Sequence, residues 1–139
     1  MENKRVIALD IGTKRIGIAM SDIMGIIASP HDSYTRQRLN ADLSYLSGII
    51  KKFDAIKVIC GLPVSLDGSM NKQAEYTKVF AEKLKEKIDV PLEYIDERFT
   101  TKSAKDTLLE FDVNRKKRKE VIDKVAASII LQNYLNKKI

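Results

Sequence analysis

Acidic residues stand in three places where this sequence is otherwise apolar, and together they could do chemistry. Asp10 follows the run VIAL, the pair Asp96 and Glu97 follows LEYI, and Asp123 lies within the apolar periodicity of the last segment. A charge at the end of a buried strand is costly unless something compensates it. Carboxylates brought together repel one another, which raises their pKa values unless a cation neutralises them. We therefore expect these side chains to converge on a metal ion.

Taken singly, each acid also has a structural interpretation. Asp10 could begin a turn, either of the next two acids could cap a following helix, and Asp123 could lie on a solvated helix face. The pair Ala126-Ala127 favours the functional interpretation, since such small residues let a helix approach a sheet closely. Asp123 falls at the edge of the apolar helix face, so its carboxylate is expected to point along the seam toward the sheet.

The ligand types narrow the choice of metal. The sequence contains one histidine, His31, and one cysteine, Cys60, which cannot build a structural zinc site. We expect His31 to be a surface residue and Cys60 a small core residue. Hard carboxylate oxygens favour Mg²⁺ or Mn²⁺. Two such ions about 4 Å apart can activate a water and stabilise the leaving oxygen of a phosphodiester, which is hydrolytic nuclease chemistry.

Five strands are predicted from runs of apolar residues bounded by turn residues. Pro30 is expected to close the third strand, because proline cannot donate a hydrogen bond to the ladder. The strands are expected at Val6–Leu9, Ile16–Met20, Gly25–Ser29, Ile56–Cys60 and Leu92–Ile95.

Four helices are predicted from apolar residues spaced three and four apart. The first begins at Asn40 or Asp42 and ends near Asp54, and the second spans 71–87. The third begins at Thr100 or Thr101 and ends near Glu110, and the fourth includes the apolar face from Val121 to Ile130. The resulting order, βββαβαβαα, predicts one α/β domain over residues 1–139 with a five-stranded mixed sheet, antiparallel first and then parallel, flanked by helices. Sites in such sheets lie beyond the carboxyl ends of the parallel strands.

The composition favours a polyanionic partner, with nucleic acid as the first candidate. The formal net charge is +6 and the pI is about 9.4. A single cysteine, no apolar run near the roughly 18 residues of a membrane span and no signal-peptide segment together predict a cytoplasmic protein without a membrane association.

Four segments carry a resemblance to a known family, and they occur in the same order as in that family. They are IALDIGTKRIGIAMSD, GLPVSLDGS, YIDERFTT and VIDKVAASIILQNYL. They resemble the YqgF family of bacterial proteins, described as Holliday junction resolvases and as nucleases in pre-16S rRNA processing. The resemblance implies a ribonuclease H-like fold and a metal-dependent site in which Asp10, Glu97 and Asp123 are the catalytic residues and metal ligands. Asp96 and Glu97 point to opposite faces of their strand, so Asp96 is the alternative to Glu97.

Basic residues near these acids are expected to hold a phosphate backbone. The run RKKRK at 115–119 is expected to directly precede the last helix, one or two helical turns from Asp123. Cations at this end of a helix oppose the helix dipole, which suggests a function for them. The alternative interpretation is that the run is only a solvated face. The loop GLPVSLDGS could present backbone N–H groups to phosphate or be only a turn. With 6% aromatic residues, recognition should be of shape and phosphate. The predicted substrate-binding residues are Lys14, Arg15, Gly61, Pro63, Arg98, Thr100, Arg115, Lys116, Lys117 and Arg118.

Three functions compete. The preferred one is a metal-dependent endonuclease of structured nucleic acid that processes the 5′ end of pre-16S rRNA in ribosome biogenesis, or alternatively resolves Holliday junctions in branched DNA. The motif DIGT at 10–13 also opens the phosphate loop of actin-like ATPases and sugar kinases, but those enzymes close two lobes around the nucleotide and 139 residues supply one. The third is a non-catalytic nucleic-acid or ribosome-binding module. Participation of ribosome-associated factors, and a monomer or a weak homodimer, stay open.

Overall fold

A five-stranded mixed sheet forms the centre of the protein. The computed structural model describes residues 2–96 and 115–137, with side chains from residue 121 onward in the second range. In the sheet order β3-β2-β1-β4-β5, the pairs β1-β2 and β2-β3 are antiparallel, whereas β1-β4 and β4-β5 are parallel. This arrangement confirms the predicted mixed sheet. The strands are β1 (Val6–Ile11), β2 (Arg15–Ser21), β3 (Ala28–Thr35), β4 (Lys57–Leu62) and β5 (Leu92–Asp96).

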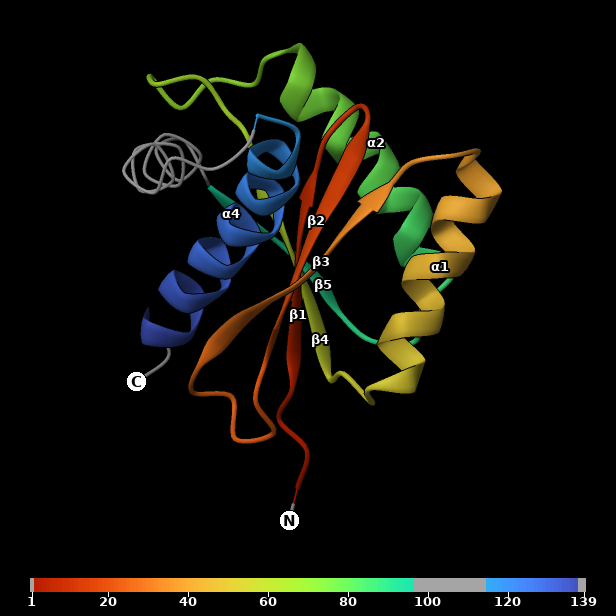
Figure 1. The fold of residues 1–139 in the computed structure, drawn as a ribbon, viewed down its shortest axis with the longest axis vertical. Helices are drawn as coiled ribbons and strands as arrows, with labels where there is room; N and C mark the ends of the chain where they lie inside the picture. The colour runs from red at the N-terminus through yellow and green to blue at the C-terminus, as the bar shows by residue number, and fades with distance from the viewer. Residues whose placement is uncertain (1, 97–114, 138–139) are drawn as a thin grey trace.

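Helices cover both faces of the sheet (Figure 1). The first face packs against α1 (Leu39–Lys52) and α2 (Lys72–Lys85), and the second against α4 (Arg115–Lys137). The helix predicted from Thr100 or Thr101 to about Glu110 lies outside the described residues. No helix in the described ranges is both long and apolar enough to cross a membrane.

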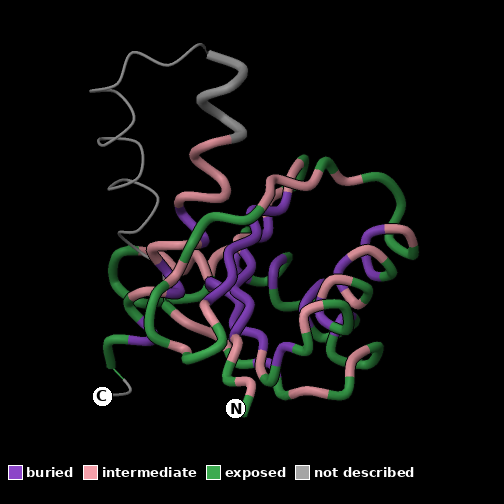
Figure 2. Tube along the Cα trace, turned by 60° about the horizontal axis from the view of Figure 1, so that its bottom comes forward, coloured by how far each residue is buried: buried purple, intermediate pink, exposed green. Residues whose placement is uncertain are grey.

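Alternating side chains of the strands feed two cores of different character. Large aliphatic residues such as Ile7, Leu9 and Ile18 face α1 and α2 and are at most 1% exposed. Small residues such as Ala8 and Ala19 face α4. Figure 2 shows the buried strands running between the helices of the two faces. The period-two pattern of each strand therefore sorts its residues between the two faces.

The side chain of Gln132 joins α4 to the loop between β2 and β3. Its Nε2 donates to the carbonyl oxygen of Ile26 at 3.0 Å, and its Oε1 accepts from the backbone N–H of Ala28 at 2.9 Å. These two bonds fix the loop against the C-terminal helix from both sides.

The third strand differs from its prediction. It begins at Ala28 and continues through Pro30 to Thr35, so the expectation that Pro30 closes it is wrong. β3 is an edge strand, where a proline costs no ladder bond if its nitrogen faces outward. Ile18 pairs with Asp32 and Ala19 with Pro30, which leaves His31 as the extra residue of a bulge.

Two helix starts also differ. The first helix begins at Leu39, with Arg38 at the cap position and no side-chain cap. Asp42 is therefore not the cap: it is a buried residue of the first turn. The last helix begins at Arg115, so the basic run 115–119 forms its first turns instead of preceding it. The second helix agrees well with its prediction, and Asn71 caps it by accepting from the N–H of Ala74 at 2.8 Å.

Candidate functional site

Asp10 lies near the end of β1 on the face that α4 covers. Val6 and Ala8, four and two residues earlier, belong to the core shared with α4, and side chains two apart on a strand share a face. Asp10 pairs directly with Gly17 of β2. The carboxylate of Asp10 is therefore directed to the same side of the sheet as α4.

Gly17 lets α4 come unusually close to this part of the sheet. A Cβ atom at position 17 would overlap the backbone carbonyl of Asp123, so the helix backbone occupies the space of the missing side chain. Ala126 and Ala127, one turn further along, are fully buried. This close approach confirms the predicted role of the two alanines and brings position 123 over the Asp10-Gly17 pair.

The carboxylate of Asp123 points toward the sheet, as predicted, and is bound there by two residues. The Nε of Arg15, at the start of β2, donates to its Oδ2 at 2.5 Å, and the hydroxyl of Ser33 on β3 donates to the same oxygen at 3.3 Å. The side chains of Arg15 and Asp123 are 26% and 22% exposed, so solvent reaches this pair. The acid is thus oriented at the seam between α4 and the sheet while remaining accessible.

Asp96 belongs to the other face. It stands two residues after Tyr94 and four after Leu92, both of which pack with the core of α1 and α2, whereas Ile95 packs with the core of α4. Asp96 therefore does not share a face with Asp10. Glu97 lies outside the described residues, so its predicted place in the site stays a prediction.

The donor chemistry of this face fits a hard divalent cation. Carboxylate oxygens such as those of Asp10 and Asp123 are the donors that Mg²⁺ and Mn²⁺ prefer. Cys60 is fully buried on the opposite face, and His31 is exposed on the edge strand. Both observations confirm the predictions for these two residues. Within the described residues, no three His, Cys, Asp or Glu side chains form a group that could hold a metal ion.

The predicted substrate-binding residues fall in several environments. Lys14 is exposed in the turn between β1 and β2, whereas Arg15 is engaged with Asp123. Gly61 is a buried residue of β4, so the strand extends beyond the predicted end at Cys60. Arg98 and Thr100 lie outside the described residues. The first turns of α4 contain Arg115, Lys116, Lys117 and Arg118.

The loop after β4 satisfies much of its own backbone. The N–H of Val64 donates to the carbonyl oxygen of Leu62 at the end of β4, and those of Ser65 and Gly68 donate to carbonyl oxygens within the loop. The N–H of Ser69 donates to the Asp67 carboxylate. The Nδ2 of Asn71 donates to the carbonyl of Pro63 at 2.9 Å. In this conformation these four N–H groups are not available to a phosphate, which restricts the predicted phosphate contact to the rest of the loop.

The ion pair of Arg36 and Asp42 is buried next to the turn that follows Asp10. The Nε of Arg36 donates to Asp42 Oδ2 at 3.1 Å, and Asp42 is 1% exposed. The Asp42 carboxylate also accepts from the Tyr34 hydroxyl and the Gln37 N–H, both at 2.9 Å. Burial by itself would raise the pKa of Asp42, but these donors outweigh it and hold the pKa below its ordinary value of 3.8.

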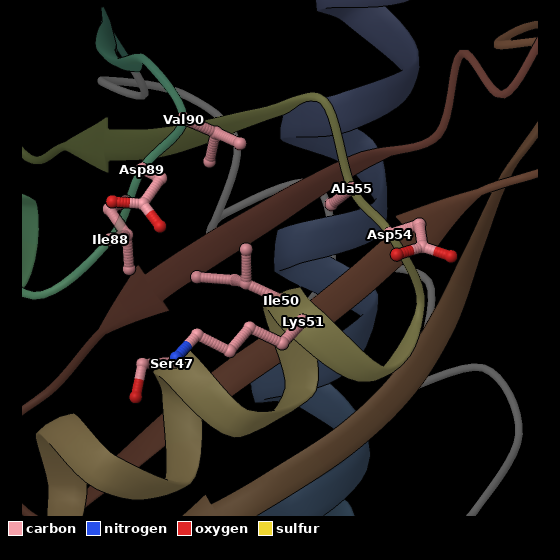
Figure 3. A pocket seen from close by; sticks show the side chains of 8 residues that line it. All are labelled: Ser47, Ile50, Lys51, Asp54, Ala55, Ile88, Asp89 and Val90. Atoms are coloured by element: carbon pink, nitrogen blue, oxygen red, sulfur yellow. The ribbon is translucent and has the colours of Figure 1, made fainter.

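A pocket of about 220 Å³ lies at the opposite edge of the sheet (Figure 3). It is formed between the end of α1 and the residues that precede β4 and β5, and Lys51, Asp54 and Asp89 are its charged residues. The pocket therefore lies at the amino ends of the parallel strands, whereas ligand sites in such sheets lie beyond the carboxyl ends. The geometry therefore favours the Asp10 edge as the functional one.

Three residues of this region were not identified from the sequence: Gly17, Ser33 and Arg36. For Gly17 a signal existed, because a glycine inside a buried strand often marks a close backbone approach. Ser33 and Arg36 carried no such signal, since their roles depend on β3 reaching Thr35 and on contacts with distant elements.

The strand order, the helices on both faces and the carboxylates of β1 and α4 define a protein of the ribonuclease H-like fold. The structure of Thermus thermophilus RuvC in complex with a Holliday junction substrate matches with a TM-score of 0.59 at 12% identity, covering 97% of this chain and 95% of that chain. The yeast mitochondrial Holliday junction resolvase Ydc2 matches with a TM-score of 0.50 at 9% identity, covering 99% and 85%. These likenesses confirm the predicted fold.

The chain belongs to the RuvX family, which is the YqgF family of the sequence resemblance. Residues 4–137 match the family profile described as "RuvX: Holliday junction resolvase". A relative from Syntrophomonas wolfei is 47% identical over 132 residues, which are 95% of this chain and 94% of the relative. A relative from Halothermothrix orenii is 46% identical over 132 residues with the same coverage. Both carry the name "Putative pre-16S rRNA nuclease".

Proposed function

We propose that this protein is a metal-dependent endonuclease that hydrolyses phosphodiester bonds in structured RNA, with the 5′ end of pre-16S rRNA as its substrate. One observation carries the proposal: Asp10 and Asp123, from opposite ends of the chain, are directed to one face at the seam where α4 meets the sheet. The names of the relatives support the substrate. Such a role belongs in the cytoplasm, among ribosome-associated factors.

Asp10, Glu97 and Asp123 would hold the metal ion, Mg²⁺ or Mn²⁺. Asp96 lies on the wrong face, which supports Glu97 as the acid contributed by this part of the chain. Bound there, the ion would supply Lewis-acid stabilisation of the charge that develops on phosphate oxygens.

The basic residues of the chain have separate tasks in this proposal. Arg15 orients Asp123 and balances part of its charge. Lys14, exposed in the adjacent turn, would bind a phosphate of the substrate. Residues 115–118 lie roughly 8 to 12 Å along the helix axis from Asp123, at about 1.5 Å per residue, and would bind the backbone next to the cleaved bond.

The test is cleavage of a matched panel of pre-16S rRNA, single-stranded RNA and a four-way DNA junction, with and without Mg²⁺ or Mn²⁺. We expect metal-dependent cleavage of the structured RNA by the wild type and loss of cleavage, by about a thousandfold or more, in Asp10→Asn and Asp123→Asn. Cleavage that persists in both variants would contradict the proposed site.

Two further variants separate the neighbouring acids Asp96 and Glu97. Glu97→Gln is expected to abolish cleavage, whereas its matched control Asp96→Asn should retain it. The reverse result would assign the role to Asp96.

A second function is favoured by the family description, which names a Holliday junction resolvase. Symmetric cleavage of the four-way junction in the same panel, together with a dimer in solution, would support it over the RNA substrate. If the wild type and Asp10→Asn bind nucleic acid equally well and the wild type cuts no member of the panel, the protein is a binding module.

A further inference from the structure

Arg36 holds both sides of the turn that joins β1 to β2. It follows the end of β3, and its Nη1 donates to the carbonyl oxygen of Gly12 at 3.1 Å. Its own backbone N–H donates to the carbonyl oxygen of Lys14 at 2.9 Å. The turn is therefore tied at two points to one residue just after β3, and it lies between Asp10 on one side and Arg15 on the other.

The turn itself is tight, so its position is sensitive to these ties. The N–H of Gly12 donates to the carbonyl oxygen of Arg15 at 2.9 Å, and a Cβ atom on Gly12 would lie 2.8 Å from that oxygen. A shift of the Gly12 carbonyl consequently moves the first residue of β2, whose guanidinium binds Asp123.

The guanidinium of Arg36 is itself fixed from behind. It lies over the ring of Phe80, 4.5 Å from the centroid, and over that of Tyr76 at 5.4 Å. Its Nη1 also donates to the Tyr76 hydroxyl, and its Nε binds the buried Asp42. The side chain of Arg36 is only 12% exposed. Elements α1 and α2 thus orient the group that holds the turn.

These contacts require an arginine. A guanidinium is planar and presents several donors in a fixed fork, so it can bind Asp42 on one edge and Gly12 on another while its face stacks on a ring. A lysine ammonium is a single point of charge on a flexible stem and cannot make this set of contacts at once.

We propose that Arg36 is a positioning residue for the nuclease site: it sets the place of the turn 12–14 and, through it, of Asp10 and Arg15. This inference rests on the proposed function for its effect on catalysis. Arg36 itself touches neither Asp123 nor the predicted metal ligand Asp10 in any described contact.

The test compares Arg36→Lys with a matched control at the other end of the sheet, Arg5→Lys. Arg5 also donates to a backbone carbonyl, that of Ser21 at 3.1 Å, and also lies over an aromatic ring, Phe53 at 5.6 Å. Both substitutions remove an arginine fork and keep the charge, but only the first affects the turn beside Asp10.

In Arg36→Lys we expect kcat on the structured RNA to fall about ten- to a hundredfold with little change in KM, because misplaced catalytic groups lose rate while substrate contacts remain. Arg5→Lys should leave kcat unchanged. Equal kcat values in both variants would overturn the proposal, since Arg36 would then act on stability alone.

Amide hydrogen exchange gives a readout that does not depend on activity. The N–H of Gly12 should exchange faster in Arg36→Lys and at the wild-type rate in Arg5→Lys. If the wild type cleaves nothing, this result still decides the role of Arg36: unchanged exchange at Gly12 overturns it, and faster exchange supports it although the proposed nuclease function has failed.

A milder variant is available if Arg36→Lys does not fold. Tyr76→Phe keeps the ring below the guanidinium and removes only the hydroxyl that accepts from it. We expect about a threefold fall in kcat together with faster exchange at Gly12, as for the loss of one hydrogen bond. Wild-type values of both would contradict the proposal.

Discussion

The protein contains an aspartate–arginine pair on each side of its sheet, and the two pairs differ in how closed they are. On the side of α4, Arg15 and Asp123 are 26% and 22% exposed. On the side of α1 and α2, Arg36 and Asp42 are 12% and 1% exposed. The acid of the first pair meets the seam where function is proposed, whereas the acid of the second accepts three hydrogen bonds inside the fold.

This difference teaches that similar chemistry serves two purposes here. Removing one partner of a buried pair leaves an uncompensated charge in the interior, which costs several kcal/mol, whereas a solvent-accessible pair contributes about 0 to 1 kcal/mol. The small residues on the α4 side bring a helix close enough to place an acid, whereas the large aliphatic residues on the other side belong to the larger of the two described buried clusters.

The largest expected effect separates the two acids. Asp42→Asn should lower the free energy of unfolding by about 3 to 5 kcal/mol, because Arg36 remains buried without its charge partner. Asp123→Asn should lower it by at most about 1 kcal/mol while abolishing cleavage. Urea denaturation of both variants measures the stability difference. Equal losses of stability would break the contrast between the pairs.

A surface pair provides the baseline for this comparison. The Nζ of Lys85 lies 4.0 Å from Glu82, with both side chains about half exposed. Lys85→Gln should change the free energy of unfolding by less than about 0.5 kcal/mol in the same assay.

The second prediction concerns the close approach of α4. Gly17→Ala should destabilise the protein by about 2 to 3 kcal/mol, because the new methyl group meets the Asp123 backbone and must push the helix away. Its control is Gly48→Ala in α1, where a Cβ atom meets nothing within 4 Å. That substitution should stabilise the protein by about 0.5 to 1 kcal/mol through helix propensity. Thermal unfolding of the two variants checks both signs.

Acid should act on the closed pair. The pKa of Asp42 is lowered in the folded protein, so below its unfolded value of 3.8 the unfolded state binds more protons. The stability from this group is complete above that value and is lost as the pH falls through the folded pKa. Urea denaturation between about pH 5 and pH 2 should show a smaller loss in Asp42→Asn than in the wild type. Parallel curves would contradict this assignment.

High pH should have the smallest expected effect on stability, and it should act on the side of the sheet that packs against α1 and α2. Burial raises the pKa of Tyr45 to about 12, and its hydroxyl donates to Asp32 at 2.9 Å, which adds to the shift. Since the folded protein favours the protonated phenol, this stability is complete below the ordinary pKa of 10 and is lost as the pH rises toward 12. The phenolate absorbance of the wild type should show one tyrosine that titrates near pH 12, and this titration should be missing in Tyr45→Phe.

Local patterns predicted much of this fold. Four of the five strands, α2 and the position of Asp123 relative to the sheet followed from apolar spacing and from Ala126-Ala127. The course of β3 through Pro30 did not, because a proline is compatible with a strand only where the strand is an edge, and edge position is a property of the whole sheet.

The candidate site could be predicted only in part, because some of its residues are defined by contacts between distant parts of the chain. Asp10 could be found because a charge at the end of an apolar strand is a local anomaly. Arg36 could not, since it is an ordinary residue between β3 and α1 until contacts with Gly12, Asp42 and Tyr76 are known. A positioning residue such as Arg36 has no local sequence pattern by which a single sequence could identify it.

The attachment of α4 to the first two strands has a consequence for synthesis of the protein. Asp123 and the Gln132 side chain that binds the β2–β3 loop are translated more than a hundred residues after Asp10 and Gly17. Because long-range contacts form only after both partners are available, the two acids cannot be brought together before α4 has been synthesised. The proposed site can therefore assemble only after the segment that carries α4 has left the ribosome.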